Sequence, residues 1–185
     1  MRALLLVISI LFLAACGGKD PMAEVNALIA EGKVPQANVV FKEMVEREQD
    51  PNLERKYVQF CFEHKQYRDF ARAVSDYIAR YPEDVELKNL QFEYYAILAQ
   101  NAERTKDYAM ALEYIVQKLL NVDYADHTKW EARQTTILTK WYQHEKEKDN
   151  DTGMREALAT MRNLGFGNLG KDLDPERYAD LESKE

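Results

Sequence analysis

The sequence has little glycine and proline, the residues that most often interrupt a helix: seven glycines and five prolines occur among 185 residues. It also lacks runs of alternating polar and apolar residues bounded by turn signals, the pattern typical of β-hairpins. The composition, 46% hydrophobic and 31% charged, is that of a globular chain. Together these features predict an all-α fold.

A basic patch is also missing. The net charge is -7, and lysines and arginines are interleaved with acidic residues along the chain. General nucleic-acid binders neutralise phosphates with clustered positive charge. The sequence therefore argues against nucleic acid as a partner.

Motifs for catalysis or metal binding are absent from the sequence. The three histidines, His64, His127 and His144, are scattered, and no HExxH, GxSxG or phosphate-binding loop occurs. Cys61 lies between two phenylalanines, which predicts a buried hydrophobe rather than a nucleophile. We expect no catalytic residue, no metal site and no cofactor, and we expect that the protein is not an enzyme.

Two segments match ligand motifs only superficially. Residues 149–151 resemble the start of a calcium loop, but Gly153 comes one position early, so they are interpreted as a turn and helix cap. Gly165 to Gly170 spells GxGxxG without the preceding strand that a dinucleotide site needs. We predict a glycine-rich loop there, with Phe166 and Leu169 pinning it to the last hairpin. A short capping helix follows, so residues 165–185 are expected to form a C-terminal loop and capping helix.

The N-terminus has the pattern of a secretory signal. Arg2 precedes an apolar run over 3–15 that is too short to span a bilayer comfortably. The run ends in Leu-Ala-Ala-Cys, which resembles the bacterial lipobox. That resemblance implies cleavage between Ala15 and Cys16, diacylglycerol on the Cys16 sulfur and acylation of its new amino group. The alternative is an ordinary signal peptide with a chance cysteine.

The residue after Cys16 bears on the predicted localisation of the protein. In lipoproteins of two-membrane bacteria, Asp at this position usually retains the protein in the inner membrane, and here it is Gly17. The resemblance therefore implies an outer-membrane anchor, a tether over 16–21, and a domain in the periplasm.

Apolar residues at helical spacing predict helical hairpins between 22 and 164. Asp-Pro pairs at 20–21, 50–51 and 174–175 predict helix starts, and Gly32 predicts a helix end. Thr128 and Glu131 have the spacing of a capping box. The hairpins expected are 22–48, 52–80, 85–123 and 128–164.

The helix expected over Thr105–Asp123 resembles the second helix of a tetratricopeptide repeat. Aligning the hairpins places four residues at that family's small-residue position, with intervals 70 - 37 = 33, 111 - 70 = 41 and 157 - 111 = 46: Ala37, Phe70, Ala111 and Ala157. Only the first interval matches the family's period of about 34, and the usual Trp and Leu-Gly of the first helix are missing. The resemblance implies a right-handed superhelix of about four stacked hairpins over 22–164. The alternative is a helical bundle.

The family resemblance also implies a peptide-binding groove lined by the first helix of each hairpin. Polar residues pointing away from the apolar stripes are its candidate lining: Arg55, Lys56, Gln59, Lys88, Gln91, Tyr95, Lys129 and Arg133. Such a groove would suit an extended acidic or amphipathic segment of another envelope protein.

Three functions follow as expectations. The first is a protein-protein interaction adaptor that assists assembly of an envelope complex, similar to a pilotin or an outer-membrane assembly accessory. The second is a structural lipoprotein that self-associates. The third is an enzyme or small-molecule binder, which would need a pocket with convergent polar groups.

Overall fold

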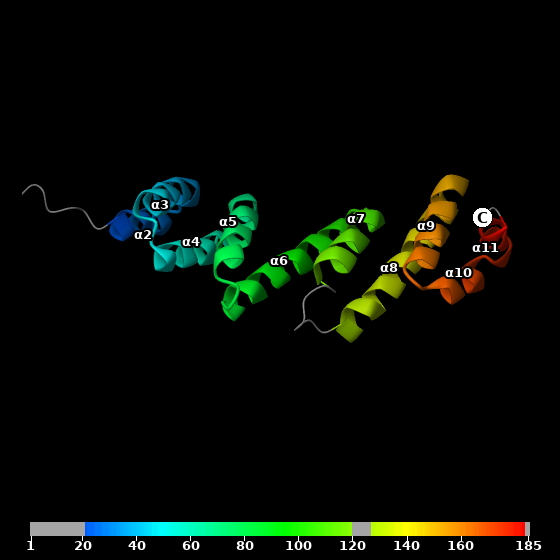
Figure 1. The fold of residues 1–185 in the computed structure, drawn as a ribbon. Coiled ribbons are helices and arrows are strands. Elements are labelled where there is room, and N and C mark those ends of the chain that lie inside the picture. The colour runs from blue at the N-terminus through cyan, green and yellow to red at the C-terminus, as the bar shows by residue number, and fades with distance from the viewer. Residues whose placement is uncertain (1–20, 120–126, 184–185) are drawn as a thin grey trace, which may run out of the picture. The chain divides into compact units, whose positions relative to one another are not determined.

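The computed structural model describes residues 21–119 and 127–183, and over these residues the chain is all-helical, without strands (Figure 1). The predicted cleavage and lipidation positions, Ala15 and Cys16, and the tether up to residue 20 lie outside the described residues. No helix in the described ranges has the length and apolar character needed to cross a membrane.

The chain divides into two compact units, residues 1–88 and 89–185. Unit 1 contains four helices and the start of α6: α2 (Pro21–Ala30), α3 (Val34–Glu48), α4 (Pro51–Glu63), α5 (Tyr67–Arg80) and α6 (Val85–Arg104). Unit 2 contains the rest of α6 and the remaining helices: α7 (Tyr108–Glu113), the π-helix η1 (Tyr114–Leu119), α8 (His127–Glu147), α9 (Asp151–Asn163), α10 (Gly167–Leu173) and α11 (Pro175–Glu182).

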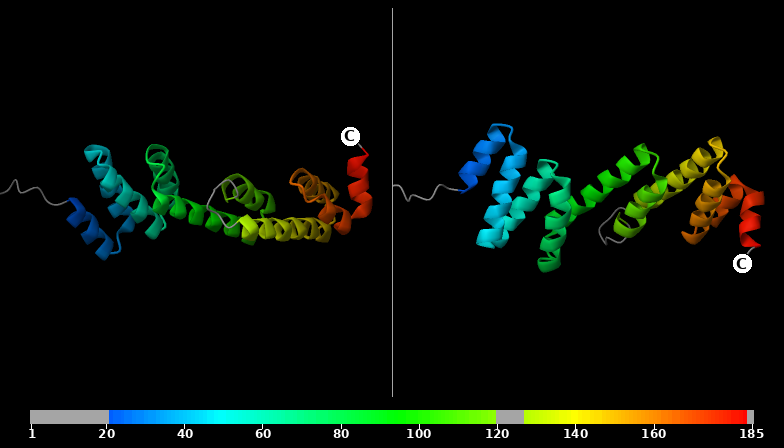
Figure 2. Two further views of the ribbon diagram at one scale, coloured as in Figure 1. Left: turned by 60° about the horizontal axis from the view of Figure 1, so that its bottom comes forward. Right: turned by 90° about the horizontal axis from the view of Figure 1, so that it is seen from above.

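Neighbouring helices pack as hairpins inside each unit. In unit 1, α2 packs on α3 and α4 packs on α5, while α3 also contacts α4 (Figure 2). In unit 2, α8 packs on α9, and α9 contacts both α10 and α11. The all-α expectation is confirmed.

Five of the turns between helices have the same geometry. In each, one residue has positive φ, its N–H donates to a carbonyl three residues back, and the next N–H donates to a carbonyl five residues back. At the first turn these bonds are Gly32 N–H to Ile29 (2.9 Å) and Lys33 N–H to Leu28 (2.8 Å). This two-bond pattern is the Schellman motif, which satisfies carbonyls left free at a helix end. The residues with positive φ are Gly32, Lys65, Lys106, Asp149 and Gly165.

Helix starts are capped mainly by aspartate. Asp50 accepts a hydrogen bond from Asn52 N–H (2.9 Å) and Asp174 accepts one from Arg177 N–H (3.1 Å), so both Asp-Pro predictions within the described residues are confirmed. Asn150 caps α9, as the interpretation of 149–151 expects. The predicted capping box is wrong in position, because α8 already begins at His127 and Thr128 lies inside it.

Each unit has its own core. Unit 1 buries an aromatic group in which the rings of Phe41 and Tyr57 lie 5.4 Å apart and those of Phe41 and Phe60 lie 5.5 Å apart. Cys61 is fully buried beside them, as predicted. Unit 2 buries a larger cluster around fully enclosed residues of η1 and α8, among them Ile115, Leu119 and Leu138.

The turns refine the alignment of the hairpins. The fifth residue after each turn position is buried in every case: Ala37, Phe70, Ala111, Met154 and Gly170. The first three match the predicted small-residue positions. In the α8–α9 hairpin, the turn at Asp149 assigns this place to Met154, three residues before the predicted Ala157, so the interval from Ala111 is 154 - 111 = 43.

The helix predicted over Thr105–Asp123 differs from expectation. Asp107 caps its start by accepting from Met110 N–H (3.1 Å), but the α-helix ends at Glu113 and continues as a π-helix to Leu119. The wider turn keeps Ile115 and Leu119 in the core, where both are 0% exposed. Residues beyond 119, up to 126, lie outside the described ranges.

The loop predicted at 165–170 is wrong, because residues 167–173 form helix α10. A Cβ at Gly170 would lie 2.5 Å from Tyr178 Cε2, so the glycine gives the Tyr178 ring its place against α10. Glycine disfavours helix by about 1 kcal/mol, and burial of Tyr178, 2% exposed, outweighs that preference here. Phe166 and Leu169 pack against the core of unit 2, as predicted. The predicted short terminal helix is present as α11.

Asp174 follows the last residue of α10 and links that helix to α8 and α11 in unit 2. Its carboxylate caps α11, accepts a hydrogen bond from the Tyr142 hydroxyl of α8 (2.6 Å) and pairs with Arg177 (2.7 Å). Burial alone would raise the pKa of Asp174, but the bonds from Tyr142 and Arg177 outweigh it and lower the pKa.

Replacing Lys65 with glycine should stabilise unit 1. Lys65 has φ 56°, a conformation that costs an L-residue about 1 kcal/mol and glycine little. We expect Lys65→Gly to raise the free energy of unfolding by about 0.5–1 kcal/mol in urea titrations followed by circular dichroism. Lys56→Gly, the same change inside α4, should lower it by about 1 kcal/mol. If both variants changed the free energy of unfolding in the same direction, the assignment of Lys65 to the turn would be contradicted.

The pKa of Asp174 predicts acid sensitivity of unit 2. A carboxyl whose pKa is lower folded than unfolded contributes stability above its unfolded pKa of about 4, and that contribution is lost as the pH falls. Asp174→Asn should destabilise unit 2 by about 1–2 kcal/mol at neutral pH and flatten the loss below about pH 4. Unfolding is read from the fluorescence of Trp130 and Trp141, both in unit 2. Asp172→Asn, an exposed neighbour, should leave both quantities unchanged.

Candidate functional site

The predicted groove residues of unit 1 are partly engaged within the unit. Arg55 Nε donates to Asp84 (2.8 Å) and its Nη2 donates to Glu86 (2.5 Å), while Gln59 donates to Glu86 (2.6 Å). The hydrogen bond from Arg55 to Asp84 is the largest influence that raises the pKa of Arg55. Lys56 is exposed. The groove therefore offers less free positive charge here than the sequence suggests.

Lys56 and Gln59 line a hollow of about 220 Å³ between α2 and α4. Its apolar lining comes from both helices and α3, and includes Val25, Ile29 and Phe60. A hollow of this kind, with an apolar floor and polar rim, suits one large apolar side chain of a partner. Lys88 does not line it.

The predicted groove residues of unit 2 line a second hollow. Lys129 and Arg133 border a space of about 320 Å³ with Gln100 and Trp130, and the Lys129 ammonium lies 5.5 Å from the centre of the Trp130 ring. Arg133 pairs with Glu103, which also accepts a hydrogen bond from Lys140 (2.8 Å).

Tyr95 and Gln91, also predicted to line the groove, do not line this second hollow. The ring of Tyr95 lies 6.4 Å from that of Tyr114 and under the Lys118 ammonium (5.7 Å), packed against the core. The structure thus brings together Lys56 with Gln59 in unit 1, and Lys129 with Arg133 in unit 2.

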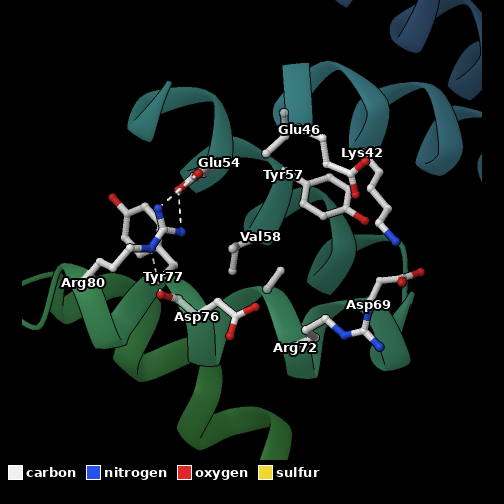
Figure 3. Close-up of a pocket in the computed structure, with 12 residues that line it drawn as sticks. Lys42, Glu46, Glu54, Tyr57, Val58, Asp69, Arg72, Asp76, Tyr77 and Arg80 are labelled. Atoms are coloured by element: carbon white, nitrogen blue, oxygen red, sulfur yellow. Dashed lines mark hydrogen bonds and ion pairs between the residues drawn. The ribbon is translucent and has the colours of Figure 1, made fainter. Parts of the chain in front are cut away.

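A third space, not anticipated from the sequence, lies among α3, α4 and α5 (Figure 3). This charged pocket has a volume of about 200 Å³ and an apolar floor that includes Val45, Val58 and Ala73. Its rim carries charges of both signs: Lys42, Glu46, Glu54, Asp69, Arg72, Asp76 and Arg80. The signal available in the sequence is the alternation along α5, where Asp69, Arg72, Asp76 and Arg80 recur at helical spacing and so share one face.

One end of the charged pocket is closed by a two-point ion pair. Arg80 Nη1 donates to Glu54 Oε1 (3.2 Å) and Arg80 Nη2 lies 2.8 Å from Glu54 Oε2. The hydrogen bond from Arg80 to Glu54 is the largest influence that raises the pKa of Arg80. At the other end, Asp69 accepts a hydrogen bond from the Asn38 side chain (2.7 Å).

Tyr57 carries a buried hydroxyl with no hydrogen-bond partner among the described residues. The side chain is 6% exposed and lines the charged pocket, and its hydroxyl points to the end where Lys42 lies (Figure 3). Burial raises the pKa of Tyr57, and the nearby Cys61, Asp69 and Glu46 act in the same direction. Burial also raises the pKa of Cys61 to about 12, so this thiol stays protonated and unreactive at neutral pH.

The polar groups around these three spaces offer charges and hydrogen-bonding atoms. No cluster of three or more His, Cys, Asp or Glu side chains suited to a metal ion occurs in the ranges that the structure describes. Each space opens to solvent, and the arrangement fits recognition of side chains or small polar molecules.

No protein-family model, no curated protein and no solved structure matches this chain.

Removing the Tyr57 hydroxyl should stabilise the free protein. A buried polar group without a partner costs about 1–3 kcal/mol, and Phe fills the same space without it. We expect Tyr57→Phe to raise the free energy of unfolding by about 1 kcal/mol in urea titrations. Tyr142→Phe, which removes a hydroxyl that donates to Asp174, should instead lower it by about 1–2 kcal/mol. A destabilised Tyr57→Phe variant would show that the hydroxyl has a structural partner.

Proposed function

We propose that this protein is an outer-membrane lipoprotein of the periplasm that acts as a tetratricopeptide-type protein-protein interaction adaptor. Its helical hairpins would stack into a right-handed superhelix, and its partner would be a segment of another envelope protein. The role proposed is assistance in assembling an envelope complex, in the manner of a pilotin or an outer-membrane assembly accessory.

The recurrence of one turn is the observation that carries this proposal. Five turns share the same pair of backbone hydrogen bonds, and helices after connecting segments start at Asp50, Asp84 and Asp174 caps. Helical hairpins of similar structure, none large enough to bury its own apolar face, gain stability by stacking on one another. Arrays of this kind are mostly binding scaffolds, because stacking leaves extended surfaces free for partners.

The two hollows would supply the contact points, on the first helices of the hairpins. The hollow of unit 1 lies between α2 and α4, and that of unit 2 lies against α6 and α8. Each combines an aromatic floor, Phe60 or Trp130, with a lysine at the rim. Such pairs of apolar anchor and rim charge suit an amphipathic segment with acidic residues.

The proposed lipid on Cys16 would keep the domain near the membrane. Four residues separate Cys16 from Pro21, the start of α2. An extended chain covers at most about 3.6 Å per residue, so α2 would begin within about 18 Å of the lipidated residue. An adaptor held at that distance meets membrane-bound partners at high effective concentration.

Self-association is a second candidate because of the surface of the first hairpin. α2 has one charged residue in ten, Glu24, and exposes Ala23, Ala27 and Ala30, while Val39 of α3 is 55% exposed. Terminal units of a stack usually present a polar outer face. Sedimentation velocity over a hundredfold concentration range distinguishes the two, since a strict monomer excludes self-association.

Photo-crosslinking in the native bacterium tests the adaptor proposal. A benzophenone side chain at Lys56 or Lys129, one in each hollow, should capture the same envelope protein. Arg68 on α5 and Glu156 on α9, exposed positions away from the hollows, serve as matched controls. Capture from all four positions alike, or from none, would refute the assignment of the hollows.

The anchor is tested separately. Cys16→Ser should leave the precursor unprocessed or release the protein from outer-membrane fractions, whereas Cys61→Ser should not. A Cys16→Ser variant that fractionates with the outer membrane as the wild type does would refute the lipid anchor without bearing on the hollows.

A further inference from the structure

The charged pocket among α3, α4 and α5 holds charges of both signs that are not used within the protein. In the part of the chain that the structure describes, five of its rim residues form no ion pair: Lys42, Glu46, Asp69, Arg72 and Asp76. Two are cations and three are anions, and Asp69 accepts a hydrogen bond from the neutral Asn38 side chain. A complementary ligand therefore carries both a negative and a positive group.

Arg72 and Asp76 set the spacing of those charges. They are four residues apart on α5 and line the same pocket, so their side chains start about 5–6 Å from each other on one face of the helix. They do not pair across that distance, and Figure 3 shows them directed to different parts of the pocket. A small molecule with an ammonium next to a carboxylate spans this gap.

The size and floor of the pocket restrict the ligand further. The volume of about 200 Å³ has room for one or two amino-acid residues, and Val45, Val58 and Ala73 offer an apolar surface. Tyr57 is 6% exposed, and its buried hydroxyl, which has no partner, is a donor at the end where Lys42 and Arg72 lie (Figure 3). A buried donor of this kind is satisfied when a ligand oxygen reaches it.

We propose that the charged pocket binds a zwitterionic α-amino acid or dipeptide with an apolar side chain. Its carboxylate meets Arg72, Lys42 and the Tyr57 hydroxyl, its ammonium meets Asp76, and its side chain lies on Val45, Val58 and Ala73. Asp69 carries its charge at the end of the pocket that receives the ligand carboxylate, and it accepts a hydrogen bond from the Asn38 side chain (2.7 Å). Glu46 lies one helical turn from Lys42 on α3. This site is separate from the two hollows of the proposed adaptor function.

Isothermal titration calorimetry on the mature chain in detergent tests the proposal, with free leucine and dileucine as probes. We expect dissociation constants on the order of 0.1–1 mM, as for a small open site. N-acetyl-leucine amide, which keeps the apolar body and loses both charges, should not bind. Arg72→Gln and Asp76→Asn should each weaken binding by about five- to tenfold. Arg68→Gln, on the same helix outside the pocket, should bind as the wild type does.

The Tyr57→Phe variant distinguishes a role of Tyr57 in ligand binding from a purely structural role. The variant should be more stable than the wild type when free and should bind leucine more weakly by about threefold or more. Absence of binding at about 10 mM probe, equal binding of the capped compound, or wild-type affinity in both charge variants would overturn the proposal. None of these outcomes bears on crosslinking at Lys56 or Lys129, so the two proposals fail independently.

Discussion

The fold depends on one backbone arrangement, the left-handed residue that ends a helix and turns the chain back. At each of the five turns, two hydrogen bonds close the helix end and fix the direction of the next helix, so side chains at equal distances from the turn reach the core together. The fifth residue after every such turn is buried, whether it is alanine, phenylalanine, methionine or glycine. The turn therefore sets the register, and the core adapts its side chains to it.

Sequence reasoning recovered the parts of this fold that local chemistry decides. Asp-Pro pairs and Gly32 marked helix ends correctly because caps and left-handed glycines act within a few residues. The turns at Lys65 and Lys106 lack glycine and give no such signal, and at 149–151 the sequence indicates a turn without showing which residue takes the costly left-handed conformation. The shift from Ala157 to Met154 follows because the sequence did not identify Asp149 as the left-handed residue of the turn predicted at 149–151.

Long-range packing explains what the sequence could not predict elsewhere. Gly167 and Gly170 suggested a loop, but both lie under Tyr178, whose ring occupies the space that their missing side chains leave. The predicted groove shows the same limit: sequence spacing identified polar positions, while the pairing of Arg55 with Asp84 and of Arg133 with Glu103 depends on residues about thirty positions away. Spacing along a helix gives the face of a side chain and leaves its partner undefined.

The charged pocket stands out because it departs from the rules that the rest of the chain follows. Five helix ends are closed by the same turn, Asp174 is bonded on three sides and Cys61 is buried in the core. Tyr57, one turn before Cys61 on α4, keeps a buried hydroxyl without a partner, and Arg72 and Asp76 remain unpaired one turn apart. A chain that satisfies its polar groups elsewhere tolerates such a group where a ligand completes it. The missing partner is then supplied from outside the protein.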